Sequence, residues 1–262
     1  MTATIVPTFD LTGRVALITG ASSGFGARWA RLLSAAGAKV VIAARRAEKL
    51  EALAQDIRTA GGEVLAVALD VTDPAATVAA YDAAEAAFGT VDTIIANAGT
   101  STEKGSLDVE PGEFEQILAT NLSGVFYTVR EGARRLIAAG SAEKGNGRVI
   151  IVSSITAKKL YSGTAPYSAS KAAALHMGRV LAREWARKGI CVNTILPGYI
   201  QTEMTGDLFD EGNRAGEHLL KSFPRRALAP IAAMDVPLLF FASDMSRHVT
   251  GSELTVDDGQ SL

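Results

Sequence analysis

The run Tyr167-Ser-Ala-Ser-Lys171, preceded by Ser154, is the part of this sequence whose residue types and spacing best suit proton-transfer chemistry. Residues four apart lie on one face of a helix, so the Tyr167 phenol and the Lys171 ammonium should point the same way. A phenol titrates near ~10, and a nearby cation favours the ionised form and lowers that pKa. Such a tyrosine can exchange a proton with an alcohol or a ketone at ordinary pH. An exposed helix with an unrelated Tyr and Lys is the alternative.

A glycine-rich loop near the N-terminus suggests a nucleotide-binding site. Residues 14–19 form a short apolar run typical of a strand, and residues 27–36 are typical of a helix. Between them lie Gly20, Gly24 and Gly26, in the spacing GxxxGxG. Glycines permit a tight turn and a close approach of the backbone to a pyrophosphate, whose charge faces the amide N–H groups at the helix start. A plain glycine-rich turn is the alternative.

Six elements, in order, resemble the classical short-chain dehydrogenase/reductase family over nearly the whole chain. They are TGxxxGxG at residues 19–26, Asn97-Ala98-Gly99, Asn121, Ser154, the Tyr167 to Lys171 motif, and Pro197-Gly198 followed by Thr202. The sequence departs from the family pattern at two positions, neither of which would take part in the reaction. Ala96 stands where the family often has Asn, and Asp258 stands where its C-terminal segment often reads DGG. The sequence is identified as a member of this family.

The resemblance implies a role for each catalytic residue. Tyr167 would be the general acid or base, and Ser154 would hydrogen-bond the substrate oxygen beside the phenol. Lys171 would lower the pKa of Tyr167 and bind the nicotinamide ribose, while Asn121 would hold a water molecule in a proton relay. Ser154 is preferred over the adjacent Ser153 because its spacing to a small residue, Ser-x-x-Ala, resembles the family's catalytic strand end.

The resemblance also implies a set of cofactor-binding residues. Asp70 would reach the adenine, and Asn97 and Gly99 would lie on the adenosine side. Ile200 and Thr202 would meet the carboxamide. The full expected set is Gly20, Ser22, Ser23, Gly24, Phe25, Gly26, Arg45, Asp70, Val71, Asn97, Gly99, Tyr167, Lys171, Pro197, Gly198, Ile200 and Thr202.

The end of the second expected strand indicates which dinucleotide is preferred. NAD enzymes usually place Asp or Glu there to bind the ribose 2′-hydroxyl, and that acid would repel a 2′-phosphate. Here the position is Ala44, and Arg45, whose guanidinium fork suits a phosphate, follows directly. The sequence therefore favours NADP(H) over NAD(H). The alternative is that Arg45 and Arg46 are solvated residues at a helix start.

Strand and helix patterns alternate along the chain, which predicts one Rossmann-type α/β domain over residues 1–262, with a doubly wound parallel sheet and helices on both faces. Beyond the first unit, strands are expected at residues 39–43, 63–69, 92–96, 148–152, 190–196 and 254–256. Helices are expected at residues 47–60, 75–88, 111–139, 167–187 and 232–243. Because ligands bind beyond the carboxyl ends of such strands, the chemistry-bearing residues should meet at one edge of the sheet.

Composition narrows the class of protein. The chain has 262 residues, of which 48% are hydrophobic, and 26 basic residues nearly balance 28 acidic ones. This balance gives no reason to expect nucleic acid or an anionic membrane as a partner. Three His and one Cys make a metal site unexpected. Residues 1–10 lack the basic and apolar regions of a signal peptide, so a cytoplasmic protein is expected.

The substrate is the least determined feature. Residues 199–226 should fold over the site as a lid. The leading interpretation is an NADP(H)-dependent oxidoreductase that interconverts a ketone or aldehyde and an alcohol, as a carbonyl reductase or alcohol dehydrogenase. A 3-oxoacyl-thioester reductase is the alternative within the family. A dinucleotide-binding regulatory protein without turnover is the alternative from another class, and the intact catalytic set argues against it.

A homo-oligomer is also expected. The resemblance implies a homotetramer, or a homodimer, built from the two long helices. The helical patterns at residues 114–137 and 167–185 carry apolar residues on more than one face, which is more than a single core contact needs. Residues 249–256 would pack near a second interface.

Overall fold

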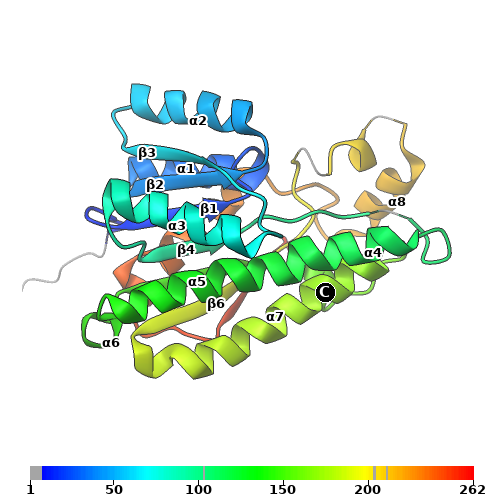
Figure 1. Ribbon diagram of the computed structural model, residues 1–262. Helices are drawn as coiled ribbons and strands as arrows, with labels where there is room; N and C mark the ends of the chain where they lie inside the picture. Colours follow the sequence, from blue (N-terminus) through cyan, green and yellow to red (C-terminus); the bar gives the residue numbers. More distant parts are fainter. Residues whose placement is uncertain (1–7, 103, 203–204, 211) are drawn as a thin grey trace, which may run out of the picture.

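The computed structural model describes residues 8–102, 104–202, 205–210 and 212–262. Within these residues, seven parallel strands form one sheet in the order β3-β2-β1-β4-β5-β6-β7 (Figure 1). The strands are β1 Val15–Thr19, β2 Lys39–Ala44, β3 Val64–Ala68, β4 Thr93–Ala96, β5 Gly147–Val152, β6 Ile190–Pro197 and β7 Glu253–Val256. The strand order reverses on either side of β1, and in doubly wound sheets this switch point is where ligands bind.

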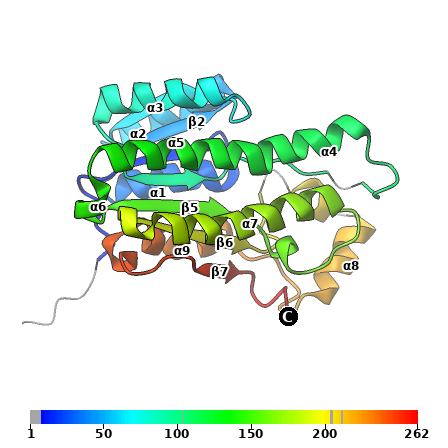
Figure 2. The same ribbon diagram turned by 60° about the horizontal axis from the view of Figure 1, so that its bottom comes forward.

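Helices cover both faces of the sheet, as predicted (Figure 2). The longer helices are α1 Gly24–Ala35, α2 Ala47–Thr59, α3 Pro74–Phe88, α4 Pro111–Leu118, α5 Val125–Ala138, α7 Ala165–Trp185, α8 Arg214–Ser222 and α9 Asp235–Ala242. One core lies under α1, α2 and α9, and it includes Ile18 and Ile42 of the central strands. The neighbouring residues Leu17 and Val41 point to the other core, under α3, α5 and α7, because side chains alternate along a strand.

The helix predicted at residues 111–139 forms and runs without a break through residue 138. A π-helical turn, Ala119–Gly124, lies within it and separates the α-helical segments α4 and α5. Within this turn the Asn121 side chain is fully buried and hydrogen-bonds to Thr100 and Ser170. Single π-turns inside α-helices are frequent at functional sites, and the apolar periodicity of the sequence does not reveal them.

Two further elements differ from the prediction. Helix α1 begins at Gly24 instead of Ala27, because Ser23 is still extended and acts as the N-cap. A short helix, α6 Ser141–Lys144, separates α5 from β5. In the lid, the described residues form a 3-10 turn, Asp207–Phe209, and helix α8, which is capped by Asn213. Lid residues 203–204 and 211 lie outside the described residues.

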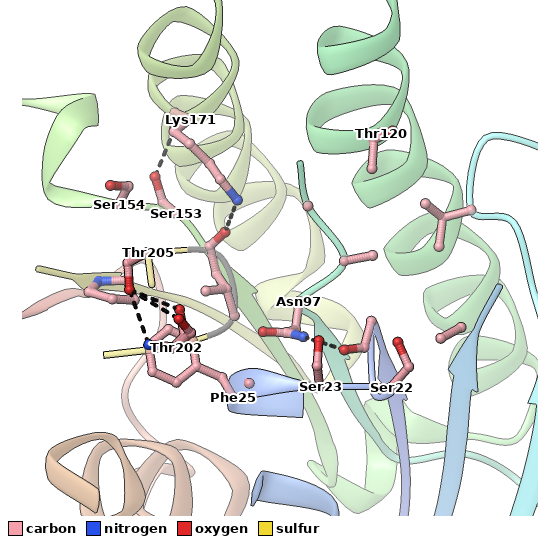
Figure 3. A pocket seen from close by; sticks show the side chains of 18 of the residues that line it. Ser22, Ser23, Phe25, Asn97, Thr120, Ser153, Ser154, Lys171, Thr202 and Thr205 are labelled. Carbon is pink, nitrogen blue, oxygen red and sulfur yellow. Dashed lines mark hydrogen bonds between the residues drawn. The ribbon is translucent and has the colours of Figure 1, made fainter. Parts of the chain in front are cut away.

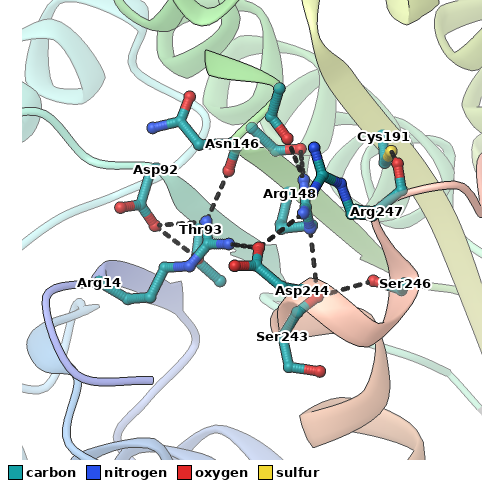
Figure 4. A network of polar contacts seen from close by, with 12 residues as sticks. Arg14, Asp92, Thr93, Asn146, Arg148, Cys191, Ser243, Asp244, Ser246 and Arg247 are labelled. Atoms are coloured by element: carbon teal, nitrogen blue, oxygen red, sulfur yellow. Dashed lines mark hydrogen bonds and ion pairs between the residues drawn. The ribbon is translucent and has the colours of Figure 1, made fainter. Parts of the chain in front are cut away.

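A polar network joins the amino ends of the central strands, at the edge of the sheet opposite the cleft described below (Figure 4). Arg14 donates to Asp92 Oδ1 at 3.4 Å and to the Asn146 carbonyl oxygen at 2.6 Å. Arg148, which is 1% exposed, donates to Asp244 Oδ1 at 3.0 Å, and Arg14 pairs with the same carboxylate. The network ties the segments before β1 and β4 to β5.

No helix in the described part of the chain is long and apolar enough to cross a membrane.

Candidate active site

A cleft of about 380 Å³ opens at the carboxyl ends of the strands (Figure 3). It gathers most of the residues that the sequence analysis selected from distant parts of the chain. The selected residues that line it are Gly20, Ser22, Ser23, Gly24, Phe25, Arg45, Asp70, Val71, Asn97, Gly99, Ser154, Tyr167, Lys171, Pro197, Gly198, Ile200 and Thr202. Gly26 and Asn121 are buried and are not among the lining residues.

The glycine loop is shaped for close approach. Gly20 has φ +68°, and a Cβ atom there would lie 2.8 Å from the Ala98 Cα atom. A Cβ atom on Gly26 would lie 2.8 Å from the Ala21 Cα atom, so this glycine serves helix packing. Because α1 starts at Gly24, the amide groups of its first turn open onto the cleft. This N-terminus carries the positive end of the helix dipole and suits a phosphate.

Asn97 holds two strand ends together at the base of the loop. Its side-chain amide donates to the Thr19 carbonyl oxygen at 2.9 Å, and its backbone N–H donates to Thr19 Oγ1 at 3.1 Å. Asn97 therefore lines the cleft while its side chain fixes β1 against β4.

Two arginines stand at the end of β2. Arg45 is exposed and lines the cleft beside the buried Ala44. Arg46, which the sequence analysis did not include in the site, donates to Ser22 Oγ at 3.0 Å and to Ser23 Oγ at 2.7 Å. The sequence contains one clue to Arg46, namely a second arginine directly after Arg45. Only the fold brings this arginine next to the two serines of the glycine loop.

Asp70 stands across the cleft after β3. Its carboxylate accepts hydrogen bonds from the backbone N–H of Thr72 at 2.9 Å and from the Thr72 hydroxyl at 2.8 Å. These hydrogen bonds lower the pKa of Asp70. The carboxylate is thus kept ionised and can accept a hydrogen bond. It lines the part of the cleft where the family resemblance implies that the adenine binds.

The predicted catalytic side chains meet at the inner end of the cleft. Lys171 Nζ lies 5.7 Å from the centre of the Tyr167 ring and donates to the Val152 carbonyl oxygen at 2.9 Å. Ser154 follows β5 and hydrogen-bonds with the Tyr167 hydroxyl. Ser153, by contrast, donates to the Lys171 carbonyl oxygen at 2.8 Å and is committed to helix α7.

The electrostatics differ from the prediction. Burial raises the pKa of Tyr167, and the hydrogen bond with Ser154 opposes this shift. Burial also lowers the pKa of Lys171 to about 8. The predicted lowering of the Tyr167 pKa is therefore not found in the protein by itself, because desolvation of the phenol is the largest effect on it.

Asn121 connects two elements of the site. Its Oδ1 accepts from the Thr100 backbone N–H at 2.8 Å, and its Nδ2 donates to the Thr100 carbonyl oxygen at 2.8 Å and to Ser170 Oγ at 3.0 Å. The side chain thus fixes the loop after β4 to helix α7 one residue before Lys171. Its predicted role in a proton relay stays a prediction.

The C-terminal segment supports the far wall, which the sequence analysis did not anticipate. Gln260 is 1% exposed, and its side chain accepts from the Tyr199 N–H at 2.7 Å and donates to the Tyr199 carbonyl oxygen at 3.0 Å. A Cβ atom on Gly198 would lie 2.8 Å from the Asp257 Cα atom. The Pro197-Gly198 turn thus packs closely against the C-terminal residues. These contacts fix the position of Tyr199, the first residue of the lid.

Comparisons with known proteins agree with this geometry. The sequence model of the family described as short chain dehydrogenase matches residues 14–213. The 3-oxoacyl-[acyl-carrier-protein] reductase FabG of Escherichia coli (strain K12) is 36% identical, over 95% of this chain and 98% of that protein. D-threitol dehydrogenase of Mycolicibacterium smegmatis is 33% identical, over 97% of this chain and 95% of that protein.

A solved structure shows the same fold. It is a gluconate 5-dehydrogenase from Burkholderia cenocepacia J2315 in complex with NADP and tartrate. It has a TM-score of 0.90 and 34% identity to this chain, and the match covers 97% of each chain. These matches agree with the glycine loop and with the pair formed by Tyr167 and Lys171. The chain therefore belongs to the short chain dehydrogenase family.

Proposed function

We propose that this protein is an NADP(H)-dependent oxidoreductase that interconverts a ketone or aldehyde and an alcohol, with Tyr167 as the general acid or base. The observation that carries the proposal is the convergence of Ser154, Tyr167 and Lys171 at the inner end of a cleft whose outer end is the glycine loop. A dinucleotide cleft that ends on a half-buried phenol suits transfer of a hydride and a proton to one substrate.

The described residues fit the dinucleotide. The Gly20 turn and the N-terminus of α1 would hold the pyrophosphate, and Asp70 would lie at the adenine. Arg45 and Arg46 would meet a ribose 2′-phosphate, and the buried Ala44 removes the acid that would repel it. The complex of the Burkholderia cenocepacia structure with NADP supports this choice. When bound, the nicotinamide supplies hydride donation or acceptance.

The protein's own groups would manage the substrate oxygen and its proton. Ser154 would donate a hydrogen bond to the substrate oxygen and hold it beside the phenol of Tyr167. In ketone reduction Tyr167 would donate its proton to that oxygen, and in alcohol oxidation it would accept the proton back. Lys171, buried beside the ring, would stabilise the phenolate formed during reduction.

The test of the catalytic assignment is Tyr167→Phe. Only the proton donor is lost, so we expect kcat to fall by about 10²–10⁴-fold while the dissociation constant for NADPH stays nearly constant. Tyr127→Phe, on the outer helix α5, is the matched control and should keep wild-type kinetics. Absorbance of the reduced nicotinamide gives the rate, and its fluorescence gives the binding. A variant that retains a substantial fraction of the wild-type rate would contradict the assignment.

The test of the cofactor preference is the double variant Ala44→Asp with Arg45→Ala. It removes an attraction to the 2′-phosphate and adds a repulsion, so the ratio of kcat/KM for NADPH to that for NADH should fall by about a hundredfold. Arg187→Ala, remote from the cleft, serves as the control for a lost arginine. A clear preference of the wild-type enzyme for NADH would overturn the assignment.

A 3-oxoacyl-thioester reductase is the second candidate. It is favoured by the 36% identity to the Escherichia coli 3-oxoacyl-[acyl-carrier-protein] reductase over nearly the full length of both proteins. A panel of simple ketones, alcohols and acetoacetyl thioester, each with NADPH or NADP⁺, separates the two candidates by kcat/KM. A protein that binds the cofactor tightly and turns over no carbonyl compound in the panel would point to the regulatory alternative.

A further inference from the structure

The residues that follow β7, 257–262, contact two segments that line the inner end of the cleft. The first segment follows β6 and includes Gly198, which lines the cleft, and Tyr199, which lines a smaller pocket adjoining it. The second segment follows β5 and includes Ser154, which lines both. One stretch of chain thus touches both sides of the place where the nicotinamide and the substrate oxygen would meet.

Gln260 makes the contact with the first segment. It is 1% exposed, and its side chain accepts from the Tyr199 N–H at 2.7 Å and donates to the Tyr199 carbonyl oxygen at 3.0 Å. A Cβ atom on Gly198 would lie 2.6 Å from Gln260 Oε1, so the two segments are in close contact. A side chain that bonds to both the donor and the acceptor of one residue fixes the position of that residue and the orientation of its peptide groups.

The turn that carries Gln260 is itself held by hydrogen bonds. The Asp257 carboxylate, in a residue that is 8% exposed, accepts from the backbone N–H of Gly259 at 3.0 Å and of Ser261 at 2.8 Å. The Gln260 N–H donates to the Asp257 carbonyl oxygen at 2.9 Å. The Gln260 amide therefore extends from a fixed base, and Tyr199 takes its position from that base.

The same turn is joined to the segment that carries Ser154. Lys159 Nζ donates to the main-chain carbonyl oxygen of Gln260 and to that of Leu262 at 3.2 Å. The Lys159 N–H in turn donates at 2.8 Å to the carbonyl oxygen of Ile155, in the 3-10 turn that Ser154 caps. Gln260 thus bonds to one side of the site through its side chain and to the other side through its main chain.

We propose that Gln260 is a positioning residue for hydride transfer. It holds residues 197–200, which would contact the nicotinamide end of the cofactor, at a set distance from Ser154, which would hold the substrate oxygen. Gln260 does not line the cleft, so it acts through Gly198 and Tyr199 and exchanges no proton with the substrate. The proposal rests on the proposed function and adds a residue to the same site.

The first test is Gln260→Met, which keeps the length of the side chain and removes both hydrogen bonds to Tyr199. For the ketone that the wild type reduces fastest, kcat should fall by about 10–100-fold, because a shift of about 1 Å between the reactants has an effect of this size. The dissociation constant for NADPH should change by less than about threefold, since the phosphates would bind at the other end of the cleft. Gln55→Met, on the exposed side of α2, is the matched control and should keep wild-type kinetics.

The second test, Gln260→Glu, supplies a rescue that depends on pH. A protonated carboxyl offers one donor and one acceptor, as the amide does, whereas a carboxylate can only accept and would face the Tyr199 carbonyl oxygen. Burial should raise the pKa of the introduced carboxyl above its usual value of ~4.3. The kcat of the variant divided by that of the wild type should be near one at pH 5.5 and about tenfold lower at pH 8. This division removes the titration of the catalytic residues, which both proteins share.

Fluorescence titration with NADPH counts the binding-competent protein, and kcat is expressed per bound NADPH. A residue that only stabilises the fold would lower this count and the midpoint of thermal unfolding, and would leave kcat per bound NADPH unchanged. That result for Gln260→Met, or a kcat ratio for Gln260→Glu that is the same at every pH, overturns the positioning role and leaves the proposed function standing. If Gln260→Met does not fold, the pH dependence of Gln260→Glu decides. A wild-type protein that turns over no carbonyl compound refutes the proposed function, and the positioning role with it.

Discussion

Lys171 is 4% exposed, and its ammonium donates to the Val152 carbonyl oxygen at 2.9 Å. Burial lowers its pKa to about 8, so Lys171 is charged below that pH and becomes neutral above it. Burial raises the pKa of its neighbour Tyr167, which therefore keeps its proton through the same range. The pair is suited to ketone reduction near neutral pH, where a protonated phenol lies beside a charged ammonium.

This pairing predicts a pH dependence. With saturating cofactor, kcat/KM for ketone reduction should fall as pH rises through about 8, because Lys171 loses the charge that stabilises the phenolate. Alcohol oxidation needs the phenolate and should accelerate as pH rises. The apparent pKa belongs to the coupled pair.

Lys171→Met isolates the contribution of the ammonium. The fall in reduction near pH 8 should vanish, because the group that titrates there is gone. Lys188→Met, on the surface, controls for a lost lysine. Unchanged profiles in the Lys171 variant would show that another group tunes Tyr167.

At the scale of elements, the strand ends opposite the cleft depend on buried charge. Asp92 is 8% exposed, and burial raises its pKa, an effect that the Arg14 guanidinium opposes. Arg14 also reaches the Asn146 carbonyl oxygen, so a single side chain ties the starts of β1, β4 and β5 (Figure 4). A buried ion pair contributes little over an apolar pair, but loss of one partner leaves an uncompensated charge.

Arg14→Met should therefore lower the free energy of unfolding by about 3 kcal/mol at pH 8. The loss should shrink as the pH falls. A carboxyl whose folded pKa lies above its unfolded value takes up its proton first in the folded state, and this removes the buried charge. Arg31→Met is the control: it breaks an exposed pair with Asp56 and should cost less than about 1 kcal/mol. Urea denaturation at several pH values measures both, and equal losses in the two variants would contradict the argument.

At the scale of the whole molecule, helices α4, α5 and α7 form one outer layer, with α4 and α7 in contact (Figures 1 and 2). Apolar side chains remain exposed on it. Phe114 of α4 and Ile137 of α5 are each 40% exposed, and Val180 of α7 is 44% exposed. Apolar residues that stay exposed on an outer helical layer favour contact with another protein surface, and the predicted homo-oligomer would cover them.

We expect light scattering at micromolar concentration to give four times the chain mass of 27.3 kDa, or twice that mass if only a dimer forms. Val180→Asp should shift the mass toward the monomer, because it places a charge in an apolar interface. Ala52→Asp, on the exposed side of α2 across the sheet from this layer, controls for added charge on another surface. A wild-type protein that is only monomeric would refute the homo-oligomer.

The alternation of strand and helix patterns determined the sheet and its two helical layers. Short, continuously apolar runs mark strands that are buried on both faces, and apolar residues with a period of 3.6 mark helices that are buried on one face. The parallel topology then placed Gly20, Asp70, Asn97, Ser154 and Pro197 at one edge, as predicted. The TGxxxGxG and Tyr167 to Lys171 patterns were informative because each is local: one turn and one helical face already fix the relative positions of their residues.

Tertiary structure alone decided what depends on neighbours far apart in sequence. The π-turn lies where Asn121 hydrogen-bonds to Thr100 and Ser170, and apolar periodicity contains no information about such contacts. Arg46 meets the glycine loop, and Gln260 supports Tyr199, only because the chain folds back on itself. The pKa values of Tyr167 and Lys171 are set mainly by burial, a property of the packed protein that a four-residue spacing does not contain.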